Sequence, residues 1–183
     1  KRLFDFFVSS VVIIFILSWL YPLIAILIKK QSKGPVLFKQ MRTGKKNKPF
    51  CCYKFRSMYL DDDNESQQVK RGDCSVTPIG KFIRRTSLDE MPQFFNVFMG
   101  NMSVVGPRPH MIKHTNDYND HVHNFMVRHF VKPGITGLAQ ISGLRGEIKD
   151  VSDIKRRVNT DIKYVQTWSL FTDIKICFFT III

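Results

Sequence analysis

Residues 6–28 read FFVSSVVIIFILSWLYPLIAILI, and this stretch decides what kind of protein the chain is. No charged side chain interrupts it, and it is longer than the roughly 20 residues that an α-helix needs to cross the hydrocarbon core of a bilayer. A cleaved signal peptide has a shorter apolar region, of about 7–15 residues, and a small-residue site after it. Here Lys29 and Lys30 follow directly. We therefore predict that the segment stays in the chain and lies in a membrane.

The path of this segment through the membrane has two readings. Pro22 cannot donate a hydrogen bond to the Ser18 carbonyl, so a kink is expected there, and the Ser18 hydroxyl can satisfy the freed backbone. Lysine and arginine flank the segment on both sides, and the positive-inside preference cannot place both flanks in the cytoplasm if the helix crosses. A re-entrant hairpin over 1–33 satisfies both flanks. The alternative is a single span, which the length alone favours.

Composition and charge indicate one membrane-associated domain over 34–183. The 183 residues suit a single domain, and 44% hydrophobic with 23% charged residues excludes a disordered tail or a multi-span channel. The net charge of +13 is concentrated in the first third of the chain, which predicts an anionic partner there. Because the basic segment adjoins an apolar hairpin, we expect anionic phospholipid headgroups rather than nucleic acid. The four cysteines lack Cys-x-x-Cys or Cys/His ligand spacing, which argues against zinc and a disulfide scaffold.

The rest of the chain predicts a mixed, helix-rich α/β fold. Residues 36–40 and 50–58 are strand-like and flank a basic turn, so a β-hairpin is expected, with Lys54 and Arg56 on one face. Thr77 and Pro78 are typical of the start of a short basic helix. Further helices are expected over 89–98, over 111–130, and once or twice within 148–181.

Asp89 and Glu90 are the strongest candidates for chemistry. SLDE at 87–90 is a formal capping box, but that register places Pro92 at the fifth helical position, whereas a start at Asp89 places it in the first turn. The two carboxylates then lie at a helix N-terminus, where free N–H groups attract phosphate. Such a pair either caps the helix or holds Mg²⁺ and supplies a nucleophile for phosphoryl transfer.

Two loops carry weaker signals of the same kind. GPRP at 106–109 places Arg108 between two prolines, which makes it either an aimed phosphate ligand or a solvated side chain on a rigid loop. KPGITGLAQ at 132–140 allows close backbone approach to a diphosphate, although no familiar nucleotide-binding motif occurs. His110, His114, His121 and His123 lack a third metal ligand in the pattern, so we expect them to be solvated or capping.

Together these residues resemble the bacterial sugar transferases, the monotopic polyprenyl-phosphate phosphoglycosyl transferases. The similarity covers nearly the whole chain, in order. It rests on KRxxD at 1–5, GPVLFKQ at 34–40 with RTG at 42–44, KFRSM at 54–58, TSLDEMPQFFNV at 86–97, GNMSVVGPRP at 100–109 and KPGITGLAQ at 132–140.

The resemblance implies a re-entrant membrane helix and a small α/β body with amphipathic surface helices on the cytoplasmic face of the bacterial inner membrane. It further implies Mg²⁺-dependent transfer of a sugar 1-phosphate from a UDP-sugar to undecaprenyl phosphate, with release of UMP. By position, Asp89 is the nucleophile that forms a phosphosugar-aspartyl intermediate, and Glu90 binds or positions Mg²⁺ with it. The residues implied to surround the diphosphate and nucleotide are Lys54, Arg56, Arg84, Arg108 and Gln140.

Two departures from the family pattern refine these expectations. RGE at 145–147 resembles the larger hexose-phosphate transferases, whose upstream membrane helices and extra soluble domain agree with a chain that begins at Lys1. Arg145 and Glu147 are therefore expected to reach the sugar and to favour a neutral hexose, although Glu147 alternatively caps the following helix. Asn101 replaces an aspartate, which removes a charge expected near the site. The sequence leaves a homo-oligomer open, and a non-catalytic basic adaptor at the membrane surface remains the rival function.

Overall fold

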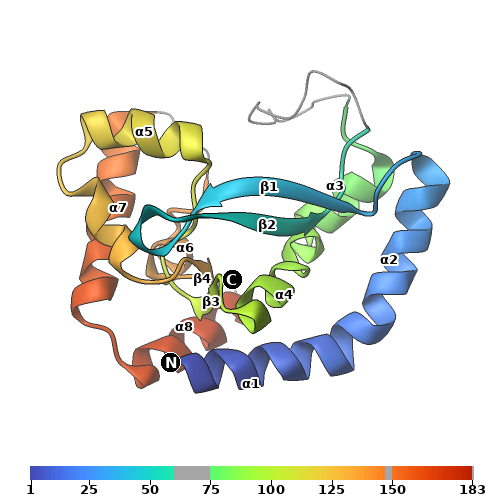
Figure 1. Cartoon of the computed structure of the whole chain (residues 1–183), viewed down its shortest axis with the longest axis horizontal. Helices are drawn as coiled ribbons and strands as arrows, with labels where there is room; N and C mark the ends of the chain where they lie inside the picture. The colour runs from blue at the N-terminus through green and yellow to red at the C-terminus, as the bar shows by residue number, and fades with distance from the viewer. Residues whose placement is uncertain (60–74, 147–149, 183) are drawn as a thin grey trace.

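The computed structural model describes residues 1–59, 75–146 and 150–182. Within them, a long bent helix at the N-terminus runs along two sides of a body made of two small sheets and several helices (Figure 1). The mixed, helix-rich α/β class predicted from the sequence is confirmed.

The N-terminal helix consists of α1 (Arg2–Val12), the π-helical segment η1 (Ile13–Leu17) and α2 (Ser18–Gln31), which contains Pro22. Figure 1 shows α1 and α2 running in clearly different directions, with the bend between them. A π-helical turn and a proline are both known causes of sharp kinks. Within the described residues this is the one helix long and apolar enough to cross a membrane by length and composition.

One face of the bent N-terminal helix packs on the body, and much of its remaining surface is apolar and exposed. Leu17, Leu20, Ile24 and Ile28 recur at helical spacing and are buried against a cluster that includes Phe55 and Ile83. The opposite surface exposes large apolar side chains, namely Phe7, Ile14, Phe15, Trp19, Leu23 and Ile26. Such a contiguous exposed apolar surface is characteristic of a membrane or protein interface.

Polar contacts hold both ends of the bent helix to the body. The buried Asp5 carboxylate accepts hydrogen bonds from the Ser103 hydroxyl at 2.8 Å and the Val104 N–H at 2.9 Å. Beyond the end of α2, Arg56 donates to the Ser32 and Lys33 carbonyls at 2.9 and 2.8 Å. Hydrogen bonds therefore join both α1 and the end of α2 to the body of the molecule.

The predicted hairpin is present as β1 (Leu37–Thr43) and β2 (Pro49–Phe55), which pair antiparallel with Leu37 opposite Phe55. The turn contains the short segment η2 (Lys45–Asn47), in which Lys46 and Asn47 have φ of 54° and 58°. Two successive residues with positive φ form the turn type that matches strand twist. Strand β2 ends before Arg56, so the expected common face with Lys54 does not continue to that residue.

The second sheet pairs β3 (Ser103–Val105) with β4 (Gly134–Thr136) in parallel. The glycines of the 132–140 segment serve this close packing: a Cβ on Gly134 would lie 2.1 Å from the Gly106 nitrogen, and one on Gly137 would lie 2.2 Å from the Gly106 oxygen. The close backbone approach that we expected toward a diphosphate is therefore made to the chain itself, just before Pro107.

Helix α3 (Pro78–Arg85) begins as predicted, because Thr77 accepts the Gly80 N–H at 2.9 Å. The predicted 111–130 helix is instead α5 (Ile112–His121) and η4 (Phe125–Phe130), separated around Asn124, whose φ is 61°. Helices α7 (Val151–Gln166) and α8 (Leu170–Ile182) agree with the helical region expected within 148–181. The short helix α6 (Leu138–Ile141) was not expected, because it lies in the glycine-rich segment before that region.

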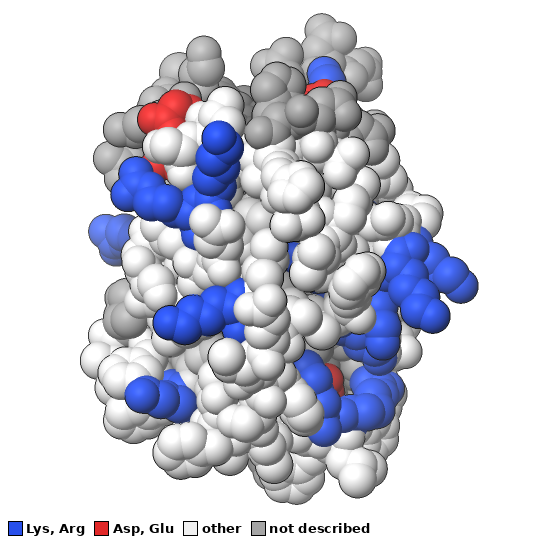
Figure 2. All heavy atoms as spheres, turned by 90° about the vertical axis from the view of Figure 1, so that its left-hand side faces the viewer, with Lys and Arg blue, Asp and Glu red and all other residues white. Residues whose placement is uncertain are grey.

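Helix α8 exposes apolar side chains and buries an aspartate. Asp173 and Ile176 are buried, whereas Phe171, Ile174, Phe178 and Ile181 are at least half exposed. In Figure 1, α8 lies next to the N-terminal end of α1. Figure 2, which views the molecule from the α5 and α7 side, shows several separate groups of Lys and Arg and few Asp or Glu, in line with the net charge of +13.

Candidate active site

The Asp89–Glu90 pair lies in a tight turn rather than at the start of an α-helix. Ser87 has a φ of 58°, residues Leu88–Glu90 form the 3₁₀ segment η3, and α4 (Gln93–Met99) begins only after Pro92. Ser87 makes no capping hydrogen bond through its side chain, so neither predicted helix register occurs. The turn instead presents two neighbouring carboxylates in different surroundings.

Glu90 is held by two cations. Its Oε1 accepts hydrogen bonds from Lys54 Nζ at 2.9 Å and Arg108 Nη2 at 2.5 Å, and its Oε2 accepts from Arg108 Nη1 at 3.0 Å. Burial favours the protonated form, but the charges and hydrogen bonds of Arg108 and Lys54 together outweigh it and hold the pKa of Glu90 well below its usual range. Glu90 is therefore an anion locked into a buried cluster.

Asp89 has much weaker compensation. Lys54 Nζ lies 4.0 Å from its Oδ2, and the residues that the structure describes provide no hydrogen bond to this carboxylate. Burial raises the pKa of Asp89, and the nearby Glu90 charge adds to this effect, against partial opposition from Lys54, Arg84 and Arg108. A poorly paired, desolvated carboxylate is more basic and more nucleophilic than a fully paired one.

The strand that carries Lys54 is fixed relative to the turn by Asn96 on α4. The Asn96 side chain accepts from the Tyr53 N–H at 3.0 Å and donates to the Cys51 carbonyl at 2.7 Å. Since Asn96 is fully buried, these two bonds join α4 to the edge of β2 in a single register. Lys54 consequently meets the carboxylates that precede α4.

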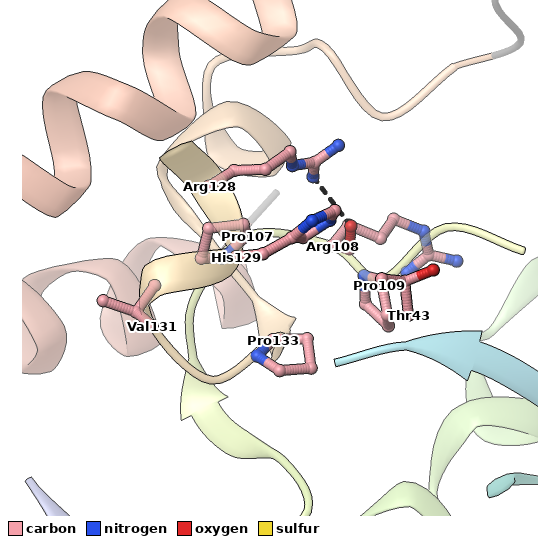
Figure 3. A pocket seen from close by; sticks show the side chains of 8 residues that line it. All are labelled: Thr43, Pro107, Arg108, Pro109, Arg128, His129, Val131 and Pro133. Carbon is pink, nitrogen blue, oxygen red and sulfur yellow. Dashed lines mark hydrogen bonds between the residues drawn. The ribbon is translucent and has the colours of Figure 1, made fainter. Parts of the chain in front are cut away.

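The loop that carries Arg108 is held by its carbonyl groups. Arg42 Nη1 donates to the Pro109 carbonyl at 2.8 Å, the Thr43 N–H donates to the His110 carbonyl at 3.1 Å, and Arg128 Nη2 donates to the Arg108 carbonyl at 2.8 Å. A cavity about the size of a water molecule lies behind this loop, between Arg108, Arg128, His129 and the prolines Pro107, Pro109 and Pro133 (Figure 3).

Two further predicted residues approach the carboxylate turn. Arg84 donates from Nε to the Ser57 hydroxyl at 2.7 Å and is close enough to influence the pKa of Asp89. Arg145 donates from Nη2 to the Ser87 hydroxyl at 2.9 Å, on the exposed side of the turn. Basic side chains therefore surround the two carboxylates from several elements.

The other predicted residues that the structure describes make no hydrogen bond or ion pair with the two carboxylates. Arg56 is occupied by the carbonyls that follow α2, and Gln140 donates to the Ile135 carbonyl at 2.9 Å in its own segment. Glu147 lies outside the described residues. Asn101 is exposed and follows the C-terminal end of α4, whereas Asp89 and Glu90 precede the N-terminal end of that helix. The structure therefore does not support the expectation that residue 101 contributes a charge near the two carboxylates.

Sequence reasoning missed several residues that build this site. His110 was expected to be solvated or capping, but it is buried, and burial together with Arg128, Arg157, Arg42 and Arg108 lowers its pKa well below the usual value. Arg128 is buried although arginine is rarely found in protein interiors. No local pattern marks either residue, because their partners are distant in sequence.

The chain is similar to a known protein family over its whole length. A family model described as bacterial sugar transferase matches residues 1–183. A UDP-glucose:undecaprenyl-phosphate glucose-1-phosphate transferase of Klebsiella pneumoniae is 49% identical over 99% of the chain, and a protein of the same name from Escherichia coli (strain K12) is 45% identical over 99%. The chain spans 39% of the length of each.

A further relative differs in the sugar that its name gives. The UDP-N-acetylgalactosamine-undecaprenyl-phosphate N-acetylgalactosaminephosphotransferase of Aeromonas hydrophila is 41% identical over 94% of the chain, which spans 41% of that protein. Relatives of comparable identity thus carry names with different donor sugars.

Proposed function

Because the chain belongs to the bacterial sugar transferase family, we propose that it transfers a sugar 1-phosphate from a UDP-sugar to undecaprenyl phosphate and releases UMP. The observation that carries this proposal is the contrast between the two adjacent carboxylates: Glu90 is saturated by Lys54 and Arg108, and Asp89 is partly buried and poorly paired. This arrangement supplies one nucleophile and a fixed set of charges around it.

The first step uses Asp89 as the nucleophile. A carboxylate oxygen of Asp89 attacks the phosphorus that bears the sugar, and the bond from that phosphorus to the bridging oxygen breaks, so that UMP leaves with the electron pair. Arg108 and Lys54 lie where negative charge accumulates on the phosphoryl oxygens, and such fixed charges are the main source of rate enhancement in phosphoryl transfer.

The second step returns the enzyme to its starting state. An oxygen of undecaprenyl phosphate attacks the phosphorus of the aspartyl intermediate, and the bond to Asp89 breaks and regenerates the carboxylate. The product is undecaprenyl diphosphate sugar. Neither step needs a general acid or base, because the nucleophiles and the leaving phosphate are already anionic. This agrees with a site built from arginine, lysine and carboxylates.

The carboxylates Asp89 and Glu90 fit a Mg²⁺ site only when a substrate diphosphate supplies further ligands. In the described residues no group of three or more His, Cys, Asp or Glu side chains gathers as a metal site. Mg²⁺ characteristically binds through one or two carboxylates plus substrate phosphates and water, a set that Asp89 and Glu90 complete when a diphosphate is bound. We propose that these two residues hold the ion, which neutralises charge on the diphosphate. Binding of Mn²⁺ with UDP, followed by electron paramagnetic resonance, should weaken in Asp89→Asn.

For the location we propose the cytoplasmic face of the bacterial inner membrane. The exposed apolar surfaces of α1, α2 and α8 provide area for one leaflet, and Lys29, Lys30 and Lys33 follow the apolar segment where anionic headgroups lie. Both arms of the bent helix are tied to one body, which favours a re-entrant hairpin over a span. A soluble UDP-sugar meets a lipid acceptor only at such a boundary.

The decisive experiment measures UMP release by the purified chain in lipid nanodiscs. Wild type should release UMP continuously when UDP-glucose and undecaprenyl phosphate are both present, and Asp89→Asn should abolish turnover while the chain remains folded. Arg156→Gln, a change at an exposed ion pair, is the matched control and should be fully active. Near wild-type activity in Asp89→Asn would exclude this residue as the nucleophile. No UMP release by wild type, together with vesicle binding, would favour the adaptor.

A further inference from the structure

Arg128 in η4 is a buried arginine. It is 1% exposed, and it is the largest, by residue volume, of the fully buried side chains in the described residues. Nη2 donates to the Arg108 carbonyl at 2.8 Å, and Nη1 lies 3.1 and 3.2 Å from the two ring nitrogens of His110. Figure 3 shows this side chain reaching over His129 toward the Arg108 peptide.

Asp161 on α7 supplies the charge that allows Arg128 to be buried. Asp161 Oδ2 lies 2.8 Å from Arg128 Nη2, and the side-chain exposures of the pair are 1% and 3%. An unpaired arginine at this depth would carry a large desolvation cost, so the position of one partner determines that of the other. Helix α7 therefore fixes Arg128.

The Arg108 loop needs external support because it can make few hydrogen bonds of its own. Pro107 and Pro109 have no N–H group, which leaves carbonyl oxygens as the main backbone contacts of this segment. The Arg108 carbonyl belongs to the same residue whose guanidinium holds Glu90 through two hydrogen bonds. A continuous series of contacts thus leads from Asp161 through Arg128 and Arg108 to the carboxylate turn.

We infer that Arg128, held by Asp161, is a positioning residue that determines where the Arg108 guanidinium meets the transferred phosphoryl group. The inference rests on the proposed function. Loss of the Arg128 contact leaves Arg108 in the site but free to move, and a misplacement of about 1 Å in a catalytic group can cost about 10²-fold in rate. Arg128 itself does not touch the substrate and acts only through Arg108.

The main test separates positioning from stability. Arg128→Met alone removes the 2.8 Å partner of the buried Asp161 and leaves Arg157 as the nearby cation, so it should lower the thermal midpoint. The double variant Arg128→Met/Asp161→Leu removes both charges, and such apolar replacements of buried pairs are often neutral for stability. We expect its thermal midpoint to return toward wild type while kcat/KM for UMP release stays about 10²-fold low. A double variant with restored stability and wild-type kcat/KM would overturn the inference.

A second test uses Arg128→Lys, which keeps the charge and one donor and remains informative if the Met variants do not fold. UDP carries a phosphate equivalent to the transferred phosphoryl group, and we expect Arg128→Lys to weaken UDP binding in the wild-type background. In the Arg108→Lys background the same change should weaken it by no more than about two- to threefold, because the two residues act through one contact. Independent, multiplicative effects would show that Arg128 has only a structural role.

The matched control is Asp173→Asn, which disrupts a largely buried ion pair with Lys1 that includes neither Asp89 nor Glu90. It should lower stability without changing the UDP affinity of the folded protein. A wild-type chain that releases no UMP overturns the proposed function itself. An active wild type in which the Arg108 and Arg128 effects multiply overturns only the role of Arg128.

Discussion

Lys1 Nζ lies 2.6 Å from Asp173 Oδ2, so the first residue of the chain is joined to the C-terminal helix α8. Asp173 is fully buried and also accepts hydrogen bonds from the Tyr164 hydroxyl at 2.6 Å and from Trp168 Nε1 at 2.9 Å. The contact places the start of α1 and the exposed apolar side of α8 at the same edge of the molecule. Both helices can then enter the same leaflet.

We predict that Asp173→Asn lowers the free energy of unfolding by about 1–3 kcal/mol, because it leaves buried donors without a charged acceptor. Thermal unfolding in detergent micelles measures the effect. Arg156→Gln, which removes an exposed i,i+3 ion pair, should change stability by less than about 0.5 kcal/mol. Equal effects of the two changes would contradict the importance of the buried network.

The two site carboxylates should have opposite effects on stability. The pKa of Glu90 is held low, so its charge stabilises the fold above its unfolded-state pKa, and Glu90→Gln should destabilise by about 3 kcal/mol because Arg108 and Lys54 lose their anion. The pKa of Asp89 is raised, so its charge opposes folding at neutral pH. Asp89→Asn should leave the thermal midpoint unchanged or raise it. A marked loss of stability in Asp89→Asn would contradict this assignment.

The same pKa shifts predict the acid limb of the activity profile. Attack requires ionised Asp89, and burial raises its pKa above 3.8, so activity should fall with decreasing pH at a higher pH than for an ordinary aspartate. Single-turnover UMP release without lipid acceptor isolates this group, because a lipid phosphate itself titrates near pH 6. An acid limb below the ordinary aspartate pKa would indicate that another group controls the step.

The sequence predicted those parts of the fold that local patterns encode. The apolar helix, the hairpin with its basic turn and the Thr77 cap all depend on neighbouring residues, and all are present. Predictions failed where tertiary contacts prevailed. Arg56 lies past the end of β2 and donates to the Ser32 and Lys33 carbonyls, which follow α2. Ser87 adopts a left-handed conformation that changes how Asp89 and Glu90 are presented.

The candidate site was predictable only as a set of charged residues. The resemblance to the sugar transferases implied that Asp89, Glu90, Lys54 and Arg108 act together, but nothing in the sequence distinguished Glu90 as paired from Asp89 as poorly paired. That difference depends on burial and on a few ångströms between side chains from separate elements. The glycines of the 132–140 segment were misread for the same reason, because their neighbour Gly106 is distant in sequence.

The membrane helix should enter and leave by one face. Tags placed before Lys1 and after Lys30 should both be accessible from the cytoplasmic side, and labelling of the two wild-type tags from opposite sides would exclude the hairpin. Pro22→Leu restores a backbone donor within α2, but the ties at Asp5 and Arg56 still hold both arms. We expect conversion to a span only when Pro22→Leu is combined with Asp5→Ala. Ser10→Ala, an exposed change in α1, is the matched control and should not alter labelling.

The donor sugar should be a neutral hexose. Arg145 contacts Ser87 at the exposed side of the carboxylate turn, so its side chain adjoins the place where the transferred sugar would lie. Glu147 follows two residues later in the sequence, and its carboxylate can accept from vicinal hydroxyls but would oppose an acetamido carbonyl acceptor to acceptor.

We therefore predict that UDP-glucose or UDP-galactose is preferred over the matching UDP-N-acetylhexosamine by about 10–100-fold in kcat/KM, the range of a merely unfavourable contact. Glu147→Ala should reduce this preference, and Arg156→Gln should leave it unchanged. UMP release over a panel of the four donors measures both. The cap of the following helix α7 is Asp150, which accepts from the Ser152 and Asp153 N–H groups. Preference for an acetamido sugar that persists in Glu147→Ala would show that Glu147 does not select the donor and that the sugar is selected elsewhere in the site.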